Sequence, residues 1–200
     1  MTRALIFDVG DVLIRWDARR VYPELTAAEL DAFFDEVGFH AWNLEQDRGR
    51  GWDAAVAELS ARHPHRAALI ARFHRRWHDS VPGVVEGMPE LIDRLHEAGA
   101  PLYAITNFSA EKWRESAARF PFLRERFRDV TVSAHEGVTK PDPAIYRRCL
   151  DRNGLAAADC LFVDDSPANV EGARAVGMEA VHFTGAAPLI AALRERGWPA

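Results

Sequence analysis

Several charged, hydroxyl-bearing and amide-bearing residues of this sequence follow short apolar runs. They are Asp8, Thr106, Asn107, Lys140, Asp164 and Asp165. If they meet, two carboxylates about 5 Å apart repel each other by roughly 3 kcal/mol at an effective dielectric near 20. One lysine does not neutralise three carboxylates, whereas a hard cation such as Mg²⁺ does, because it prefers oxygen ligands. A carboxylate beside such a cation is suited to nucleophilic attack on a phosphoryl group.

The runs that carry these residues have the length and composition of β-strands. They are rich in β-branched and aromatic residues and are too short for buried helices. They cover residues 4–7, 102–106, 130–133, 161–163 and 180–183. Helical spacing, with proline near the start and glycine after the end, is found at residues 89–98, 143–153, 167–176 and 188–196. The alternation predicts an α/β fold whose parallel sheet carries helices on both faces.

The polar residues would then lie at the carboxyl edge of the sheet. In open parallel sheets, ligands bind at the carboxyl ends of the strands, near a topological switch point. Asp8 would come from the first strand, Thr106 from the second and Asp164 from the fourth, and Lys140 from the loop after the third. We therefore expect one crevice to contain them all.

One long segment interrupts the alternation of strands and helices. Residues 15–81 show no convincing strand, and Thr26 and Glu29 form the capping box of a helix. Further helices are predicted at residues 54–61 and 67–78. This segment is expected to be a helical insertion, with residues 1–14 and 82–200 forming the core.

The motifs resemble those of the haloacid dehalogenase superfamily of aspartate-nucleophile hydrolases. The similar stretches occur in the order of the family, at residues 7–13, 105–107, 140–143 and 162–166, followed by Asn169. The resemblance implies a Rossmann-like three-layer core with a parallel five-stranded sheet. It also implies that the insertion is a small α-helical cap over the active site.

The resemblance assigns the phosphoryl chemistry to four positions. It implies that Asp8 is the nucleophile that forms an aspartyl-phosphate. Thr106 and Lys140 would position the phosphate, and Asn107 would contribute to substrate binding. A small phosphorylated molecule is the expected substrate.

The resemblance also implies a magnesium site. Asp8, the backbone carbonyl of Gly10 and the acids Asp164 and Asp165 would form it, with Asp165 as the direct ligand of the pair. Two residues are expected to support the site from behind. They are Ser166, which is also predicted to cap the following helix, and Asn169.

Gly10 departs from the pattern of the family's phosphatases. They usually carry at this position a second aspartate that acts as general acid and base. General acid catalysis typically contributes about 10²–10⁴-fold, so its loss favours good leaving groups such as aryl phosphates and sugar 1-phosphates. The motif is similar to that of a subgroup that includes glucose-1-phosphate phosphatases. Asp11, one residue later, is a candidate substitute for the acid.

Two alternatives to a phosphatase remain open. A metal-independent 2-haloacid dehalogenase would use the same Asp8 on a halogenated substrate, and such enzymes also lack the second aspartate. They usually carry tyrosine in place of Gly10 and lack the adjacent pair Asp164 and Asp165, so the phosphatase is favoured. The other alternative is a catalytically weak phosphate-binding pseudoenzyme, which Gly10 suggests.

The polar segment at residues 43–49 could present side chains from the cap to the substrate. Arg48 is the best candidate for that contact.

Composition limits the other function classes. The chain has 200 residues and a formal net charge of −5, which argues against a dedicated nucleic-acid binder. Its apolar runs are too short to span a membrane. Asp8 and Asp11 interrupt the first apolar stretch, so no signal peptide is expected and a cytoplasmic location is predicted. A monomer or a homodimer is equally compatible with the sequence.

Overall fold

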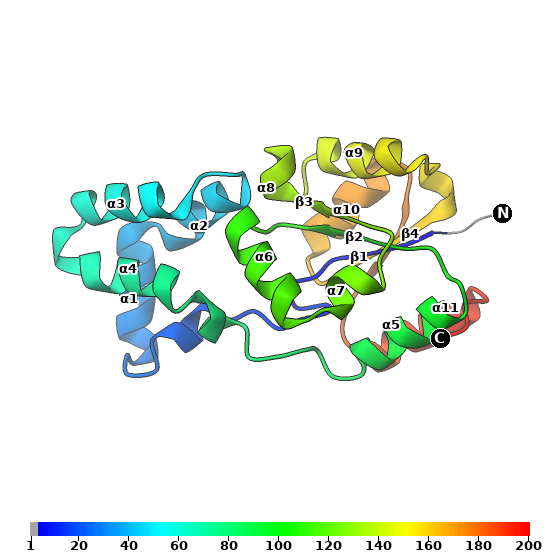
Figure 1. Cartoon of the computed structure of the whole chain (residues 1–200), viewed down its shortest axis with the longest axis horizontal. Coiled ribbons are helices and arrows are strands. Elements are labelled where there is room, and N and C mark those ends of the chain that lie inside the picture. The colour runs from blue at the N-terminus through cyan, green and yellow to red at the C-terminus, as the bar shows by residue number, and fades with distance from the viewer. Residues whose placement is uncertain (1–3) are drawn as a thin grey trace.

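The computed structural model describes residues 4–200, and its centre is a parallel sheet (Figure 1). The strands are β1 (Ala4–Phe7), β2 (Leu102–Thr106), β3 (Asp129–Val132), β4 (Cys160–Asp164) and β5 (Glu179–His182). All neighbouring strands are parallel, in the order β3-β2-β1-β4-β5. The predicted α/β fold with a five-stranded parallel sheet is confirmed. Residues 1–3 of the predicted core lie outside the described residues.

Helices pack on both faces of this sheet. Alternate side chains of β1 point to opposite faces, so Leu5 and Phe7 belong to one apolar cluster and Ala4 and Ile6 to another. The first cluster includes residues of α5 and α11, and the second includes residues of α9 and α10. These helices are α5 (Met88–Glu97), α9 (Pro143–Asn153), α10 (Pro167–Ala175) and α11 (Ala186–Glu195). The core therefore has three layers.

Several short elements of the core differ from the sequence prediction. The predicted strand at 130–133 lies at Asp129–Val132, and Ser133 begins a helix instead. Helix α6 was not predicted, because the residues on its buried face are Lys112, Ser116 and Ala117, which give little apolar signal. The elements not predicted in the core are α6 (Ala110–Arg119), α7 (Phe122–Glu125), α8 (Ser133–Glu136) and the 3-10 helix η4 (Ala157–Asp159).

The segment between β1 and α5 is helical, and within residues 18–80 the structure describes no strand. Its α-helices are α1 (Ala27–Val37), α2 (Phe39–Asp47), α3 (Trp52–Arg62) and α4 (Ala67–Arg75). Its 3-10 helices are η1 (Ala18–Val21), η2 (Pro64–Arg66) and η3 (Trp77–Ser80). The predicted capping box of Thr26 and Glu29 opens α1. The predicted helix at 67–78 is wrong at its end, because α4 stops at Arg75.

Two neighbouring chain segments join this helical unit to the sheet. The amide of Arg15 donates to the carbonyl of Gly83 at 2.9 Å, and the amide of Asp17 donates to the carbonyl of Ser80 at 2.8 Å. Figure 1 places α1–α4 to one side of the sheet, with α2 close to α8. This contact includes the Ser133 hydroxyl, which donates to the carbonyl of Asp47 at 2.6 Å.

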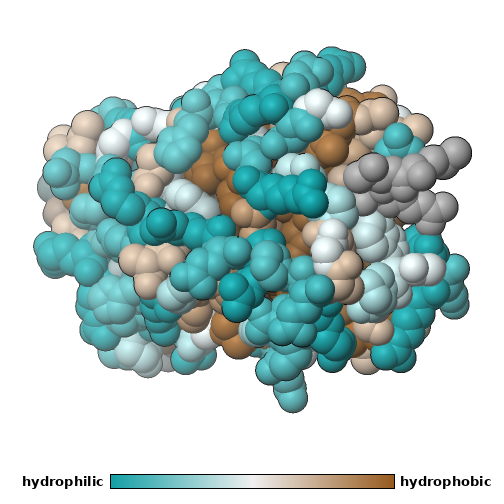
Figure 2. Space-filling model, turned by 45° about the vertical axis from the view of Figure 1, so that its right-hand side comes forward, coloured by the Kyte–Doolittle hydropathy of each residue, from teal (hydrophilic) through white to brown (hydrophobic). Residues whose placement is uncertain are grey.

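Hydrophilic residues cover most of the face shown in Figure 2, and apolar residues show mainly in the gaps between them. Within the described residues, no helix is long and apolar enough to cross a membrane.

Candidate active site

The register of the sheet brings the predicted polar residues together at one edge. Phe7 pairs with Val163 of β4, and the amide of Asp8 donates to the Val163 carbonyl at 2.8 Å. Asp8 therefore leaves β1 beside Asp164, the last residue of β4. The chain continues to β2 on one side of β1 and later crosses to β4 on the other, so this edge is a topological switch point.

Asp8, Lys140 and Asp164 form a buried ion cluster. The Lys140 Nζ lies 2.7 Å from Asp8 Oδ1 and 2.7 Å from Asp164 Oδ2. Burial raises the pKa of Asp8, and the charge of Asp164 adds to this, while Lys140 opposes it. Burial alone would lower the pKa of Lys140, but the charges of Asp8 and Asp164 raise it overall. Lys140 therefore stays an ammonium between two carboxylates.

Two amide side chains hold this cluster in place. The Asn107 side chain accepts from the backbone amide of Lys140 at 2.8 Å and donates to the Lys140 carbonyl at 3.0 Å. Asn169 Nδ2 donates to both oxygens of Asp164, at 3.0 and 3.1 Å. The ammonium of Lys140 is thus positioned by Asn107 through its backbone and by Asp164 through its charge.

The structure corrects the prediction that the Ser166 side chain caps α10. Ser166 stands at the N-cap position, but its side chain makes no capping hydrogen bond. Its backbone amide donates instead to Asp164 Oδ1 at 2.8 Å. The local hydrogen-bond acceptor at the start of α10 is therefore the carboxylate of Asp164, not the hydroxyl of Ser166.

Asp165 and Asp11 add further negative charge beside this cluster. Oxygen atoms of Asp8, Asp164 and Asp165 all lie within 4.8 Å of one another. Burial raises the pKa of Asp165, and the charges of Asp164 and Asp11 raise it further. Asp11 has a left-handed φ of 52°, and its Oδ1 accepts from the Trp16 amide at 2.9 Å. The residues present have the charge and the oxygen donors that a divalent cation requires.

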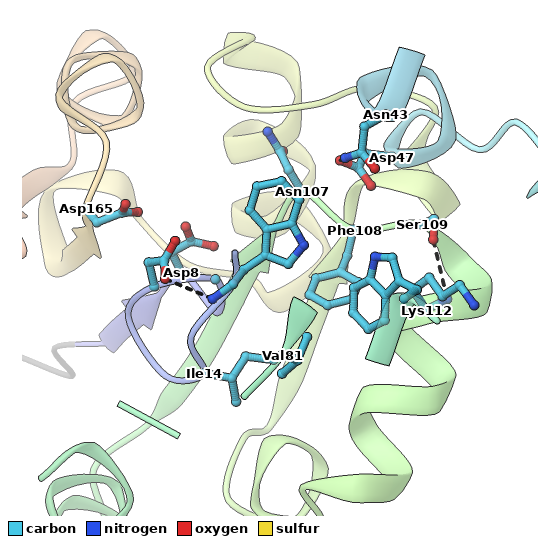
Figure 3. A pocket seen from close by; sticks show the side chains of 14 residues that line it. Asp8, Ile14, Asn43, Asp47, Val81, Asn107, Phe108, Ser109, Lys112 and Asp165 are labelled. Atoms are coloured by element: carbon cyan, nitrogen blue, oxygen red, sulfur yellow. Dashed lines mark hydrogen bonds between the residues drawn. The ribbon is translucent and has the colours of Figure 1, made fainter. Parts of the chain in front are cut away.

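A cavity of about 230 Å³ opens beside Asp8 and Asp165 (Figure 3). Gly10, Asp11 and Asn107 also line it. Its other lining residues are Ile14, Trp16, Asn43, Asp47, Trp77, Val81, Phe108, Ser109 and Lys112. Thr106 is 1% exposed at the end of β2 and does not line the cavity, whereas its neighbour Asn107 does.

Arg48 does not line this cavity but a neighbouring one, together with Lys140 and Asp142, so its contact with the substrate stays a prediction. Arg48 is exposed, and its Nη1 lies 2.7 Å from Glu45 Oε1. The segment does reach the cavity, but through Asn43 and Asp47 of α2. Residues four apart share one face of a helix, and the next position is rotated about 100° away. The i, i+4 spacing of the two polar side chains was the signal that could have identified them.

The Asp47 carboxyl is the most perturbed group in this part of the cavity. Burial raises its pKa to about 7, although the backbone amide of Ser109 donates to it. Ser109 is the N-cap of α6. Such a half-buried carboxyl facing a cavity is a functional-site candidate.

Comparison with known proteins gives the family of the chain. Residues 2–177 match a protein-family model described as haloacid dehalogenase-like hydrolase. The chain belongs to this family. The resemblance stated from its motifs is confirmed, and the protein is accordingly a hydrolase with an α/β core.

Two curated relatives of this haloacid dehalogenase-like hydrolase are phosphatases by name. Sesquiterpene phosphatase astK of Aspergillus oryzae is 28% identical over 183 residues, which cover 91% of this chain and 90% of that protein. Glyceraldehyde 3-phosphate phosphatase of Methanopyrus kandleri is 26% identical over 200 residues, covering 92% and 84%. The two relatives are named for different substrates.

Solved structures share the fold at low sequence identity. The HAD family enzyme bt-2542 of Bacteroides thetaiotaomicron superimposes with a TM-score of 0.74 at 17% identity, covering 92% of this chain and 94% of that chain. The same enzyme has been solved with magnesium and inorganic phosphate, with a TM-score of 0.70. A dehalogenase superimposes with a TM-score of 0.65 at 19% identity, covering 91% and 84%.

Proposed function

We propose that this protein is a magnesium-dependent phosphatase that hydrolyses a small phosphorylated metabolite through an aspartyl-phosphate on Asp8. The observation that carries the proposal is the buried cluster at the cavity. There Lys140 and the Val9 amide, at 2.7 and 2.6 Å, both bind Asp8 Oδ1. Oδ2 is then the oxygen available for attack. The phosphatase names of two relatives support the same reaction class.

The excess of carboxylates at the cluster fits a bound cation. Asp8, Asp165 and the carbonyl of Gly10 would hold Mg²⁺, because they line the same cavity. Asp164 is fully buried and would act mainly by holding Lys140. When bound, the ion neutralises charge on the phosphoryl oxygens. Magnesium and phosphate in the fold relative bt-2542 are compatible with this assignment.

The proposed reaction has two displacements at phosphorus. Asp8 forms an oxygen–phosphorus bond while the bond to the leaving-group oxygen breaks and that oxygen takes the electron pair. Water then forms a bond to the phosphorus while the bond to the Asp8 oxygen breaks and returns its electron pair to the carboxylate. A proton of this water passes through solvent to the leaving-group oxygen, so the products are the free alcohol or phenol and phosphate. Lys140 balances the charge of Asp8 and of the transferred group.

The helical unit of residues 15–81 would serve as a cap over the core of residues 4–14 and 82–200. Its α2 supplies part of the cavity wall, so its contact with α8 limits the access of water to Asp8. Gly10 offers no carboxyl, and Asp11 is bound to the Trp16 amide. We therefore expect fastest turnover for leaving groups that need little protonation, such as aryl phosphates and sugar 1-phosphates.

A metal-independent 2-haloacid dehalogenase is the second candidate, and the missing carboxyl at Gly10 favours it. The carboxylates of Asp164 and Asp165 weigh against it, because an anionic haloacid would meet them without a cation. Both activities would use Asp8.

A substrate panel with and without EDTA tests the proposal. We expect the protein with Mg²⁺ to hydrolyse p-nitrophenyl phosphate and to lose this activity with EDTA. Asp8→Asn should abolish it, while Asp151→Asn, an exposed change on α9, should not alter it. Chloride release from 2-chloropropionate that EDTA does not affect would overturn the proposal in favour of the dehalogenase.

A further inference from the structure

The cavity beside Asp8 has a second polar end, which lies on the cap. Asn43 and Asp47 are four residues apart on α2, and both side chains line the cavity. In Figure 3 they lie on the opposite side of the cavity from Asp8 and Asp165. A phosphate at Asp8 would leave this end for the rest of the substrate.

The hydrogen bonds of this pair leave an acceptor oxygen of Asn43 without a donor. Asn43 Nδ2 donates to Asp47 Oδ2 at 3.3 Å, and the Ser109 amide also donates to the Asp47 carboxylate. Asn43 Oδ1 is buried without a hydrogen-bond partner in the described residues. Buried carbonyl oxygens in folded proteins are nearly always paired. A ligand that completes this end must therefore donate hydrogen bonds.

Among the described residues that line the cavity, no positively charged side chain forms an ion pair with Asp47. Lys112 lines the cavity, but its Nζ lies 2.9 Å from Glu115 Oε1 and 3.3 Å from the His74 carbonyl. Burial raises the pKa of Asp47 to about 7. Desolvation of the ionised carboxyl lowers the stability of the folded protein. A residue that is unfavourable for stability and faces a cavity is a candidate for a role in ligand binding.

Apolar side chains form the wall between the two polar ends. They are Ile14, Trp16, Trp77, Val81 and Phe108. The cavity volume of about 230 Å³ is below the ~300–1,000 Å³ that is typical of sites for drug-sized ligands. The space fits one ring or a short branched chain. Because this wall is apolar, it suits such a group better than a polyol.

We propose that Asn43 and Asp47 bind a hydroxyl or ammonium group at the end of the leaving group that is remote from the phosphate. The preferred substrates are then phosphate monoesters of small phenols that carry this second, donating group. This inference rests on the proposed phosphatase function of Asp8 and names the substrate class.

Matched aryl phosphates test the proposal. 4-(Hydroxymethyl)phenyl, 4-(2-hydroxyethyl)phenyl and 4-(aminomethyl)phenyl phosphate provide the donor at different lengths and charges. 4-Methylphenyl and 4-ethylphenyl phosphate are the controls without a donor. We expect kcat/KM to favour at least one donor substrate by about tenfold, as one hydrogen bond to a buried acceptor pair supplies. Preferences under twofold for all three would overturn the proposal.

Variants of α2 connect the preference to the pair. Asn43→Leu should remove the tenfold preference, and its folding is checked by comparing its thermal unfolding midpoint with that of the wild type. Glu45→Gln, an exposed change on the same helix, should keep the preference. A preference that survives in Asn43→Leu and in Asp47→Leu would contradict the assignment.

A binding measurement separates this proposal from the phosphatase reaction. The phosphonates of 4-(hydroxymethyl)phenyl and 4-methylphenyl groups are not hydrolysed, and calorimetry gives their affinities for the protein with Mg²⁺. A tenfold difference that Asn43→Leu abolishes supports the donor site even if no phosphate ester is turned over. Equal affinities in the wild type count against the donor site even if Asp8 proves to be the nucleophile.

Discussion

The two polar ends of the cavity differ in how completely their side chains are paired. At the core end, Lys140 contacts both Asp8 and Asp164 at 2.7 Å, and Asn169 holds Asp164 from behind. At the cap end, Asn43 Oδ1 has no partner among the described residues. The core end is organised before substrate arrives, as electrostatic catalysis requires. The cap end is incomplete, as expected of a surface that selects a ligand.

We expect the largest effect when the buried Lys140 of the core is replaced, and a far smaller one when the exposed Arg48 of the cap is replaced. Lys140→Met leaves Asp8 and Asp164 buried without their cation. We expect turnover to fall about 10²–10³-fold and the free energy of unfolding to fall by about 3–5 kcal/mol. Arg48→Met removes only an exposed pair with Glu45 and should change the unfolding free energy by less than about 1 kcal/mol. Urea unfolding and initial rates measure both. Equal effects of the two substitutions would contradict the contrast.

The next effect concerns the contact that holds the cap end against the core. Gly49 has a φ of +104°, and a Cβ there would lie 2.8 Å from the Ala134 carbonyl oxygen. Gly49→Ala should therefore destabilise the protein by about 2–3 kcal/mol. Gly51→Ala is the matched control, because a Cβ at Gly51 meets nothing within 4 Å. It should change stability by no more than about 1 kcal/mol. Thermal unfolding decides, and a harmless Gly49→Ala would show that the contact is loose.

The smallest expected effect is a pH dependence at the cap end. The pKa of Asp47 is raised to about 7, so the folded protein binds this proton more tightly than the unfolded chain does. The stability that this proton supplies is present below pH 4 and is lost as the pH rises toward 7. An asparagine has no proton to lose in this pH range, so Asp47→Asn should not lose this stability. Relative to the wild type, it should raise the free energy of unfolding by about 2 kcal/mol more at pH 8 than at pH 4.

Urea unfolding at the two pH values measures this difference, and Glu45→Gln serves as the exposed control. A difference between Asp47→Asn and wild type that stays constant with pH would show that Asp47 is not desolvated in the folded protein.

The core could be predicted from sequence because each strand has a local signature. β1 and β4 are short buried runs, and each leads directly into a carboxylate, Asp8 or Asp164. Parallel pairing then forces those carboxylates to one edge. The positions of Asp8 and Asp164 follow from this rule, whereas Lys140 reaches the same edge from the loop after α8. The distances between the three side chains do not follow from it, because they depend on how Asn107 fixes the backbone of Lys140.

The cap end could not be placed in the same way. α2 was not predicted, and a polar segment without an assigned helix does not show which side chains share a face. Once α2 is known, Asn43 and Asp47 fall on the cavity side and Arg48 does not. Which way that face points depends on long-range contacts, such as the bond between Ser133 and the Asp47 carbonyl. No pattern within the segment records them.

Trapping the covalent intermediate tests the proposed role of Asp8 most directly. The protein with Mg²⁺ is mixed with p-nitrophenyl phosphate and quenched in acid within the first turnover, and its peptides are analysed by mass spectrometry. We predict a phosphoryl group on the peptide that contains Asp8, at that carboxylate, and no adduct in Asp8→Asn. Turnover without any adduct on Asp8, together with retained activity in Asp8→Asn, would contradict the account.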